Sequence, residues 1–272
     1  MKKILYIFSI VFCVSCQDVI DVELDNTDPR LVIDAYFNVY DARSSFFVNA
    51  QGGVQLSLSA PYFDEEIPSV SDATVYITDL SNNTVINFSE NTTNPGLFIP
   101  SNGFFPEFSK DYELTVEYNN NTYNASTQMI PTVAIDSVVK VDSNLFDRTE
   151  VKVYYTDPEL SDDFYLFDMD FNLFGVSEDK FYQGQSFGFP YFYEDDEFDA
   201  EQNINIKILG IDEDYYNFFN LVLEQNENDG SPFQTPPGLI KGNIINTTNS
   251  DNFPFGFFRI SEVYESSIMI EE

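Results

Sequence analysis

Histidine and tryptophan are absent from the 272 residues, although the chain has 28 phenylalanines and 17 tyrosines. Without histidine, the sequence excludes Ser-His and Cys-His nucleophilic pairs and the imidazole ligands of zinc, copper or non-haem iron. The aromatic content is too high for a disordered acidic chain, and aromatic side chains favour the half-buried surface of a sheet. The composition therefore predicts a folded, mainly β protein and argues against histidine-dependent catalysis.

Basic residues are scarce as well, with 12 Lys and Arg against 46 Asp and Glu and a formal net charge of -34. A charge of this sign repels nucleic acid and anionic lipid headgroups, so neither is expected as a partner. It suits a solvated acidic exterior, and it also favours divalent cations or a cationic partner surface. We assign no catalytic residue, no metal ligand and no cofactor from the sequence.

Cysteine occurs only at Cys13 and Cys16, at the end of an N-terminal segment with the features of a signal peptide. Two lysines precede an apolar run, Ile4–Val14, which is too short to remain as a transmembrane helix. Ser15 then stands before Cys16, and the string Cys13–Cys16 resembles a bacterial lipobox. Residues 1–15 are thus predicted to be a lipoprotein signal peptide, and Cys16 the acylated N-terminus. No disulfide is then expected within the mature chain, so an apolar core must supply the stability.

The remaining chain divides at Pro131 into two predicted β units behind an acidic tether, residues 16–30. Residues 31–130 show short alternating runs typical of an antiparallel sandwich with immunoglobulin-like or prealbumin-like spacing. The clearest run contains Tyr112, Leu114, Val116 and Tyr118, and three asparagines then predict a hairpin turn.

Residues 131–272 are predicted to form a β-rich domain with one helix near 212–227. Asp212 is a good N-cap for this helix, and the acidic residues after it complement the helix dipole. Residues 174–203, rich in glycine, aromatic residues and acid, are predicted to be a long irregular loop.

Three sequence features of this second domain are candidates for a catalytic or metal-binding site. Gly184–Gly188 fits the G-x-S-x-G nucleophile elbow, but that motif needs a histidine base, so we interpret it as a flexible turn. The acidic clusters Asp157–Asp163 and Glu194–Asp199 offer hard oxygen ligands of the kind calcium prefers. Neither cluster matches the EF-hand pattern, and with this many acids chance clustering also explains them.

The aromatic segment between residues 181 and 193 is the candidate contact region. Rigid aromatic rings supply contact area at low entropic cost, so the segment can form a partner-binding surface. Alternatively, a long loop folds over the sheet with these rings buried, and the sequence leaves both interpretations open. The candidate partner-binding residues are Phe181, Tyr182, Tyr191, Phe192 and Tyr193.

Short segments spread over nearly the whole chain resemble one known family. They are Leu31–Tyr36, Ser71–Ile77, Tyr112–Val116, Ile135–Ser137, Tyr155–Pro158, Tyr215–Phe219, Gly242–Ile244 and Gly256–Phe258. In this order they are similar to the domain-of-unknown-function 4249 family of Bacteroidota outer-membrane lipoproteins. The resemblance implies an outer-membrane lipoprotein, often encoded beside TonB-dependent receptors, with no established enzymatic activity. Asp18, Asp21 and Glu23 also look like the signal that exports lipoproteins of that phylum to the cell surface.

These expectations lead to one main functional hypothesis and two alternatives. The main hypothesis is a non-enzymatic accessory subunit of an outer-membrane TonB-dependent, SusC-like transporter or assembly. The first alternative is a stand-alone surface module that binds peptide or glycan. The second is a hydrolase, for which nothing in the sequence selects a catalytic carboxylate pair.

Replacing Cys16 with alanine is expected to abolish acylation, because the thiol is the predicted attachment point of the lipid. The variant should accumulate as a soluble protein or as an unprocessed precursor. Mass spectrometry of the mature N-terminus checks this prediction, and an unmodified Cys16 in the wild-type protein would contradict it.

Overall fold

A computed structural model describes residues 28–44, 46, 48–61, 66–141, 148–193, 202–226 and 238–270. The predicted acylation site Cys16, the export residues Asp18, Asp21 and Glu23, and the acidic cluster Glu194–Asp199 lie outside these residues. The mainly β prediction is confirmed, since the described residues form fifteen strands and one helix. No helix among them has the length and apolar character needed to cross a membrane.

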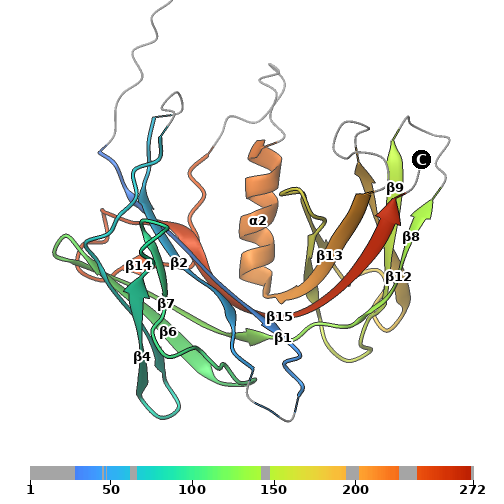
Figure 1. Ribbon diagram of the computed structural model, residues 1–272, viewed down its shortest axis with the longest axis horizontal. Coiled ribbons are helices and arrows are strands. Elements are labelled where there is room, and N and C mark those ends of the chain that lie inside the picture. The colour runs from blue at the N-terminus through green and yellow to red at the C-terminus, as the bar shows by residue number, and fades with distance from the viewer. Residues whose placement is uncertain are drawn as a thin grey trace, which may run out of the picture.

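The strands and the helix α2 follow one another along the chain as shown in Figure 1. Their bounds are β1 Leu31–Tyr40, β2 Gln51–Leu58, β3 Thr74–Asp79, β4 Thr84–Glu90, β5 Leu97–Pro100, β6 Asp111–Tyr118, β7 Asn121–Ile130, β8 Ile135–Val141, β9 Thr149–Thr156, β10 Phe164–Asp168, β11 Phe174–Glu178, β12 Ser186–Tyr193, β13 Gln202–Ile211, α2 Glu213–Asn226, β14 Ile245–Asn246 and β15 Phe255–Ile270.

The first unit is a ring of strands around one core. The hydrogen-bonded order β15-β1-β2-β5-β4-β3-β6-β7 returns to β15, because β7 also pairs with β15 at Ile260 and Ser261. Alternate residues point inward, as the apolar alternation predicts, so that Ile33, Leu56 and Leu114 are buried. The predicted hairpin joins β6 to β7, with Asn119 and Asn120 at positive φ.

The ring depends on a strand from the far end of the chain. The first half of β15 runs parallel to β1, in a register from Val32 opposite Phe255 to Tyr40 opposite Val263. Phe258 and Ile260 of β15 therefore complete the core of the first unit. The immunoglobulin-like or prealbumin-like arrangement expected for residues 31–130 is not confirmed, because this ring closes through a parallel strand from outside that range.

The second unit has three layers. The sheet β12-β9-β8 packs against one face of β10, β13 and the second half of β15, and aromatic and aliphatic side chains fill the space between them. The helix α2 covers the opposite face, where Tyr215 and Phe218 pack against Phe257. Figure 1 shows β15 running from the first unit into the second, with α2 standing between them.

The helix starts where the sequence predicts. Asp212 caps it, since the Asp212 carboxylate accepts a hydrogen bond from the backbone N–H of Tyr215 at 2.7 Å. The helix ends at Asn226, close to the predicted bound near residue 227. Burial raises the pKa of Asp212, and the hydrogen bond from the Tyr215 N–H opposes that rise.

The prediction of an irregular loop over residues 174–203 is wrong, because β11, β12 and the start of β13 lie within it. The glycines in this segment leave space for aromatic rings and do not mark a flexible loop. A Cβ added at Gly175 would lie 2.7 Å from the Phe189 ring, and one at Gly188 would lie 2.7 Å from the Tyr154 ring. Phe189 in turn stacks on Phe167, with ring centroids 4.1 Å apart. The segment therefore contains strands, and glycines on two of them, β11 and β12, allow close aromatic packing.

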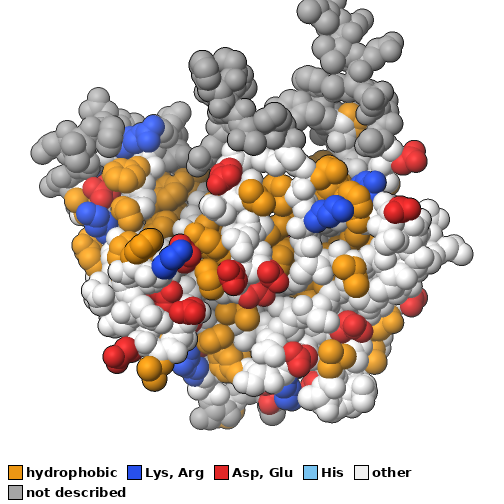
Figure 2. All heavy atoms as spheres, turned by 180° about the vertical axis from the view of Figure 1, so that it is seen from behind, with side chains coloured by type: hydrophobic (Ala, Val, Ile, Leu, Met, Phe, Trp, Pro, Cys, Tyr) orange, Lys and Arg blue, Asp and Glu red, His pale blue; other side chains and the backbone are white. Residues whose placement is uncertain are grey.

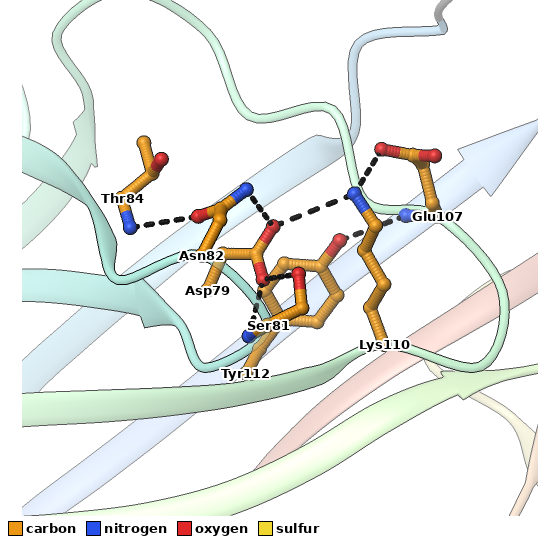
Figure 3. Close-up of polar contacts among 7 residues, drawn as sticks. All are labelled: Asp79, Ser81, Asn82, Thr84, Glu107, Lys110 and Tyr112. Atoms are coloured by element: carbon orange, nitrogen blue, oxygen red, sulfur yellow. Dashed lines mark hydrogen bonds and ion pairs between the residues drawn. The ribbon is translucent and has the colours of Figure 1, made fainter.

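The turn between β3 and β4 is fixed by a buried carboxylate, Asp79 (Figure 3). It accepts hydrogen bonds from the Ser81 backbone N–H at 2.9 Å and from the Asn82 amide at 3.1 Å. Lys110 approaches the same carboxylate at 3.6 Å and also pairs with Glu107. Burial alone raises the pKa of Asp79, but the hydrogen bonds from Ser81 and the charge of Lys110 outweigh burial and lower it. This network stabilises the turn between β3 and β4.

A second buried carboxylate, Glu262, lies where the two cores meet on β15. Both Glu262 oxygens accept hydrogen bonds at 2.8 Å from Arg43, which follows β1. Glu262 also accepts the Thr132 backbone N–H at 2.9 Å, and Arg43 donates to the Thr132 carbonyl at 3.0 Å. Three segments far apart in sequence are therefore held together at the junction between the two units.

Replacing Arg43 with methionine is expected to destabilise the protein by about 3 kcal/mol, because the Glu262 carboxylate then stays buried without its counter-charge. Chemical denaturation of the variant measures this loss. The double variant Arg43→Met/Glu262→Met should recover part of it. Glu107→Gln, which breaks only the surface pair with Lys110, should change the free energy of unfolding by less than about 1 kcal/mol. Equal effects of Arg43→Met and Glu107→Gln would refute the special role of the junction.

Candidate functional site

The five predicted partner-binding residues do not form one surface. Tyr182 and Tyr193 are buried, with exposed fractions of 8% and 0%, and Tyr191 is half-buried on β12. Tyr182 stacks on Phe187, accepts a hydrogen bond from the Tyr155 hydroxyl and shares another with the Ser177 hydroxyl. Only Phe181 and Phe192 remain exposed, at 85% and 38%. Most of the rings therefore fill the core of the second unit, as the alternative interpretation of this segment expected.

The exposed Phe181 belongs to a tip formed by two loops, residues 157–163 and 179–185. Gln183 donates to the Ser161 carbonyl at 2.9 Å, and the Gly184 N–H donates to Asp157 at 3.0 Å. On the neighbouring loop, Leu160 is 96% exposed. We call this region, with Leu160 and Phe181 as its apolar side chains, the loop tip.

Three carboxylates lie beneath the loop tip. One oxygen from each of Asp157, Asp163 and Asp179 lies within 4.8 Å of the other two, and Asp157 and Asp179 are buried. The Tyr165 hydroxyl donates to Asp157 at 2.5 Å, and the Asp163 N–H donates to Asp179 at 2.9 Å. Burial raises the pKa of both Asp163 and Asp179, and the neighbouring aspartates raise them further. The sequence grouped Asp157 with Asp163 but missed Asp179, because the strand pairing of β10 with β11 brings it there.

These three oxygens are the ligand type that a hard cation such as calcium accepts. Calcium takes about six to eight oxygen ligands, so the trio supplies only part of such a shell. Both Asp157 oxygens are already engaged by Tyr165 and Gly184. The trio is therefore an acidic cluster beneath the loop tip, in which burial and then repulsion among the carboxylates raise the pKa of Asp163 and Asp179.

A polar groove of about 470 Å³ lies beside α2, and the sequence did not identify it. Its floor is the outward face of β1, with Asp34, Tyr36 and Asn38 in alternate positions, next to Arg259 of β15. Their neighbours along β1, such as Ile33 and Phe37, point into the core of the first unit. A single strand thus supplies both the core and the groove.

The polar groups of the groove are held by their neighbours. Arg259 donates through Nη1 to Asn38 at 2.9 Å and to Ser261 at 3.0 Å. Its guanidinium carbon lies 5.4 Å from the ring centroids of both Tyr36 and Tyr215. On the far side, Lys207 donates to Asp168 at 2.7 Å. These contacts fix the side chains before any ligand arrives.

Asp34 differs from the other charged groups of the groove. Its side chain is open to solvent, and no described residue donates a hydrogen bond to its carboxylate. The walls of the groove still displace bulk water around it. This desolvation raises the pKa of Asp34, and the charge of Arg259 opposes the rise.

The rim of the groove contains strained backbone. Asp170, Phe171 and Asn172, between β10 and β11, have φ values of 67°, 50° and 61°. Consecutive left-handed residues other than glycine cost roughly 1–2 kcal/mol each, and such strain gathers at functional sites. Asn172 lines the groove, and the Asn205 N–H helps hold the turn by donating to Asp170 at 3.0 Å.

The G-x-S-x-G string has no catalytic geometry. Gly184 lies at positive φ in the loop tip, and Ser186 opens β12 rather than joining a strand to a helix. The interpretation of this string as a turn holds for Gly184 and Gln185 only, because Ser186–Gly188 belong to β12. Seen from behind the view of Figure 1, the surface of the molecule shows acidic, basic and apolar side chains intermixed rather than one charged field (Figure 2).

The fold and these sites define a mainly β protein of two units joined by one shared strand, with a polar groove beside its helix. The chain belongs to the family described as Domain of unknown function (DUF4249), whose sequence model matches residues 17–267. This confirms the family suggested by the short sequence segments. A search of curated proteins finds no match.

The acidic cluster predicts a pH-dependent gain from Asp179→Asn. Near pH 3.8, its ordinary pKa, the Asp179 carboxyl of the folded protein is largely protonated and costs little free energy. As the pH rises, Asp179 ionises in the unfolded chain before it ionises in the folded protein. The folded state therefore loses stability with rising pH until the raised pKa of the folded state is passed. Asparagine removes this loss and can still accept the Asp163 N–H. We expect the variant to have a higher free energy of unfolding than the wild type at pH 7, and little gain near pH 4.

Thermal unfolding with a chelator present checks this prediction, and Glu159→Gln, at an exposed position on the neighbouring loop, is the matched control. The control should change stability little at either pH. A lower stability of Asp179→Asn at pH 7 would show that the carboxylate is needed in its ionised form, and would contradict the repulsion argument.

Proposed function

We propose that this chain is a non-enzymatic surface lipoprotein that acts as an accessory subunit of an outer-membrane TonB-dependent, SusC-like transporter or assembly. The lipobox-like start supports a lipid anchor at Cys16, and the acidic residues after it support export to the cell surface. The lack of histidine argues against most nucleophilic chemistry. The transporter itself is inferred from the resemblance to lipoproteins that are often encoded beside such receptors.

The observation that carries the docking role is the loop tip. Leu160 and Phe181 expose almost their whole side chains on two loops that are tied together by hydrogen bonds. Exposed apolar groups on fixed loops suit a protein contact, because little conformational entropy is lost when they bind. A few such anchors supply most of the binding energy in protein interfaces.

Membrane tethering strengthens this proposal. A lipid anchor and a transporter in the same bilayer meet at a high effective concentration, so a small contact suffices for a stable complex. The acidic segment, residues 16–30, offers a tether of several tens of ångströms at most if extended. The loop tip is therefore expected to contact a partner that lies in the same membrane.

The double variant Leu160→Ser/Phe181→Ser is expected to lose the partner. We predict that the full-length wild-type chain co-purifies with an outer-membrane transporter in mild detergent, and that the variant recovers at least about tenfold less of it, as for loss of a central anchor. Ile67→Ser is the matched control, since Ile67 is 72% exposed and belongs to the first unit.

Each outcome of this experiment has a clear meaning. A wild-type protein that purifies alone would contradict the accessory role. A transporter that stays with the double variant would show that the loop tip is not the contact. Mass spectrometry identifies the co-purified protein, and circular dichroism confirms that the variants remain folded.

The stand-alone binding module is kept as a second candidate because of the groove beside α2. A concave site with a few fixed polar groups and aromatic walls is typical of small-molecule recognition. On this alternative, the wild-type protein elutes without a transporter but retains a ligand.

A further inference from the structure

We propose that the groove between β1, β15 and α2 binds an uncharged saccharide. The inference goes beyond the docking role and does not depend on it. The groove lies at the end of β10 that carries Asp168, whereas the loop tip lies at the end next to Asp163.

The charge balance of the groove points to an uncharged ligand. Two acids, Asp34 and Asp168, face two bases, Arg259 and Lys207, so the lining has no formal net charge. The whole chain has a formal net charge of -34 and only 12 basic residues, so the equal number of acids and bases is a property of the groove and not of the chain. An anion would meet the Asp34 carboxylate, and a cation would meet the fixed guanidinium of Arg259.

The open hydrogen-bonding groups suit hydroxyls. The Asp34 carboxylate accepts no hydrogen bond from a described residue, and a carboxylate can accept two neighbouring hydroxyl donors. The Asn38 carbonyl is taken by Arg259, which orients the amide and leaves its NH₂ group to donate. Adjacent ring hydroxyls of a sugar offer donors and acceptors side by side, so one saccharide can satisfy both residues.

The aromatic wall suits the apolar face of a sugar ring. Tyr36 is 41% exposed on the floor of the groove, between Asp34 and Asn38 in the alternation of β1. Tyr215 and Phe219 stack on one another at 5.5 Å and form the wall on α2. The C–H groups of a pyranose pack against such rings while its hydroxyls reach the polar residues beside them.

The groove has the size and rigidity for recognition. Its volume of about 470 Å³ is within the usual range for small-ligand sites and suits a mono- or disaccharide unit of a longer chain. The strained turn Asp170–Asn172 places Asn172 at the rim. Because Arg259 already holds Asn38 and Lys207 already holds Asp168, these side chains lose little entropy on binding.

The test uses the full-length protein, extracted in mild detergent, on an array of oligosaccharides and short peptides. The array contains uncharged hexose and pentose oligosaccharides, uronic-acid-containing and sulfated ones, and tetrapeptides of mixed sequence. We expect binding to at least one uncharged oligosaccharide and none to the sulfated series. Isothermal titration with the best uncharged oligosaccharide then measures its affinity.

Two variants locate the binding in the groove. Tyr36→Ala and Asp34→Ala should each lower the affinity for that oligosaccharide at least about tenfold, the loss expected when a fixed contact is removed. Tyr76→Ala on β3 and Asp111→Ala on β6 are matched strand controls outside the groove and should bind normally. Thermal midpoints of all four variants verify folding, and Tyr36→Phe, which keeps the ring, should retain most of the affinity.

Three results would overturn the inference. These are an array on which no uncharged oligosaccharide binds, a preference for peptides or charged sugars, and binding that survives both groove substitutions. The Leu160→Ser/Phe181→Ser variant should bind the sugar like the wild type. A failure of transporter docking therefore remains distinct from a failure of sugar binding.

Discussion

The parallel pairing of β1 with β15 is the contact on which the rest of the structure depends. It joins the first described strand to the last, with nine residue pairs in register, and β15 continues for eight further pairs along β13. The inward face of β15 passes from Phe258 in one core to Ile268 and Ile270 in the other. Without this strand the first ring stays open and the sheet of the second unit loses its outer strand, so the two units share one structural element.

One buried charge marks the change from one core to the other. Glu262 lies on the inward face of β15 between the two apolar clusters, where its carboxylate meets Arg43 and the backbone of Thr132. An apolar side chain there would pack but would not fix the angle between the segments. The bidentate pair sets one geometry, because a planar guanidinium matches a carboxylate in a single plane.

The outward faces of the same two strands form the groove. Residues that alternate with core positions, Asp34 with Ile33 and Arg259 with Phe258, come together only because β1 and β15 are neighbours. The helix α2 then adds Tyr215 as a wall. The ligand-binding proposal and the stability of the junction therefore rest on one strand pairing, whereas the loop tip depends on the separate pairing of β10 with β11.

The sequence alone determined the local elements, since alternation in β2, β6 and β13 and the cap at Asp212 act over a few residues. It also determined the family and the acidic, histidine-free character of the surface. The tertiary structure decided that residues 186–193 form the strand β12, since its pairing with β9 places the Tyr154 ring against Gly188. It alone placed Asp179 beside Asp157 and Arg259 beside Asn38, because side-chain contacts such as the last, between residues 221 positions apart, leave no local periodic signal.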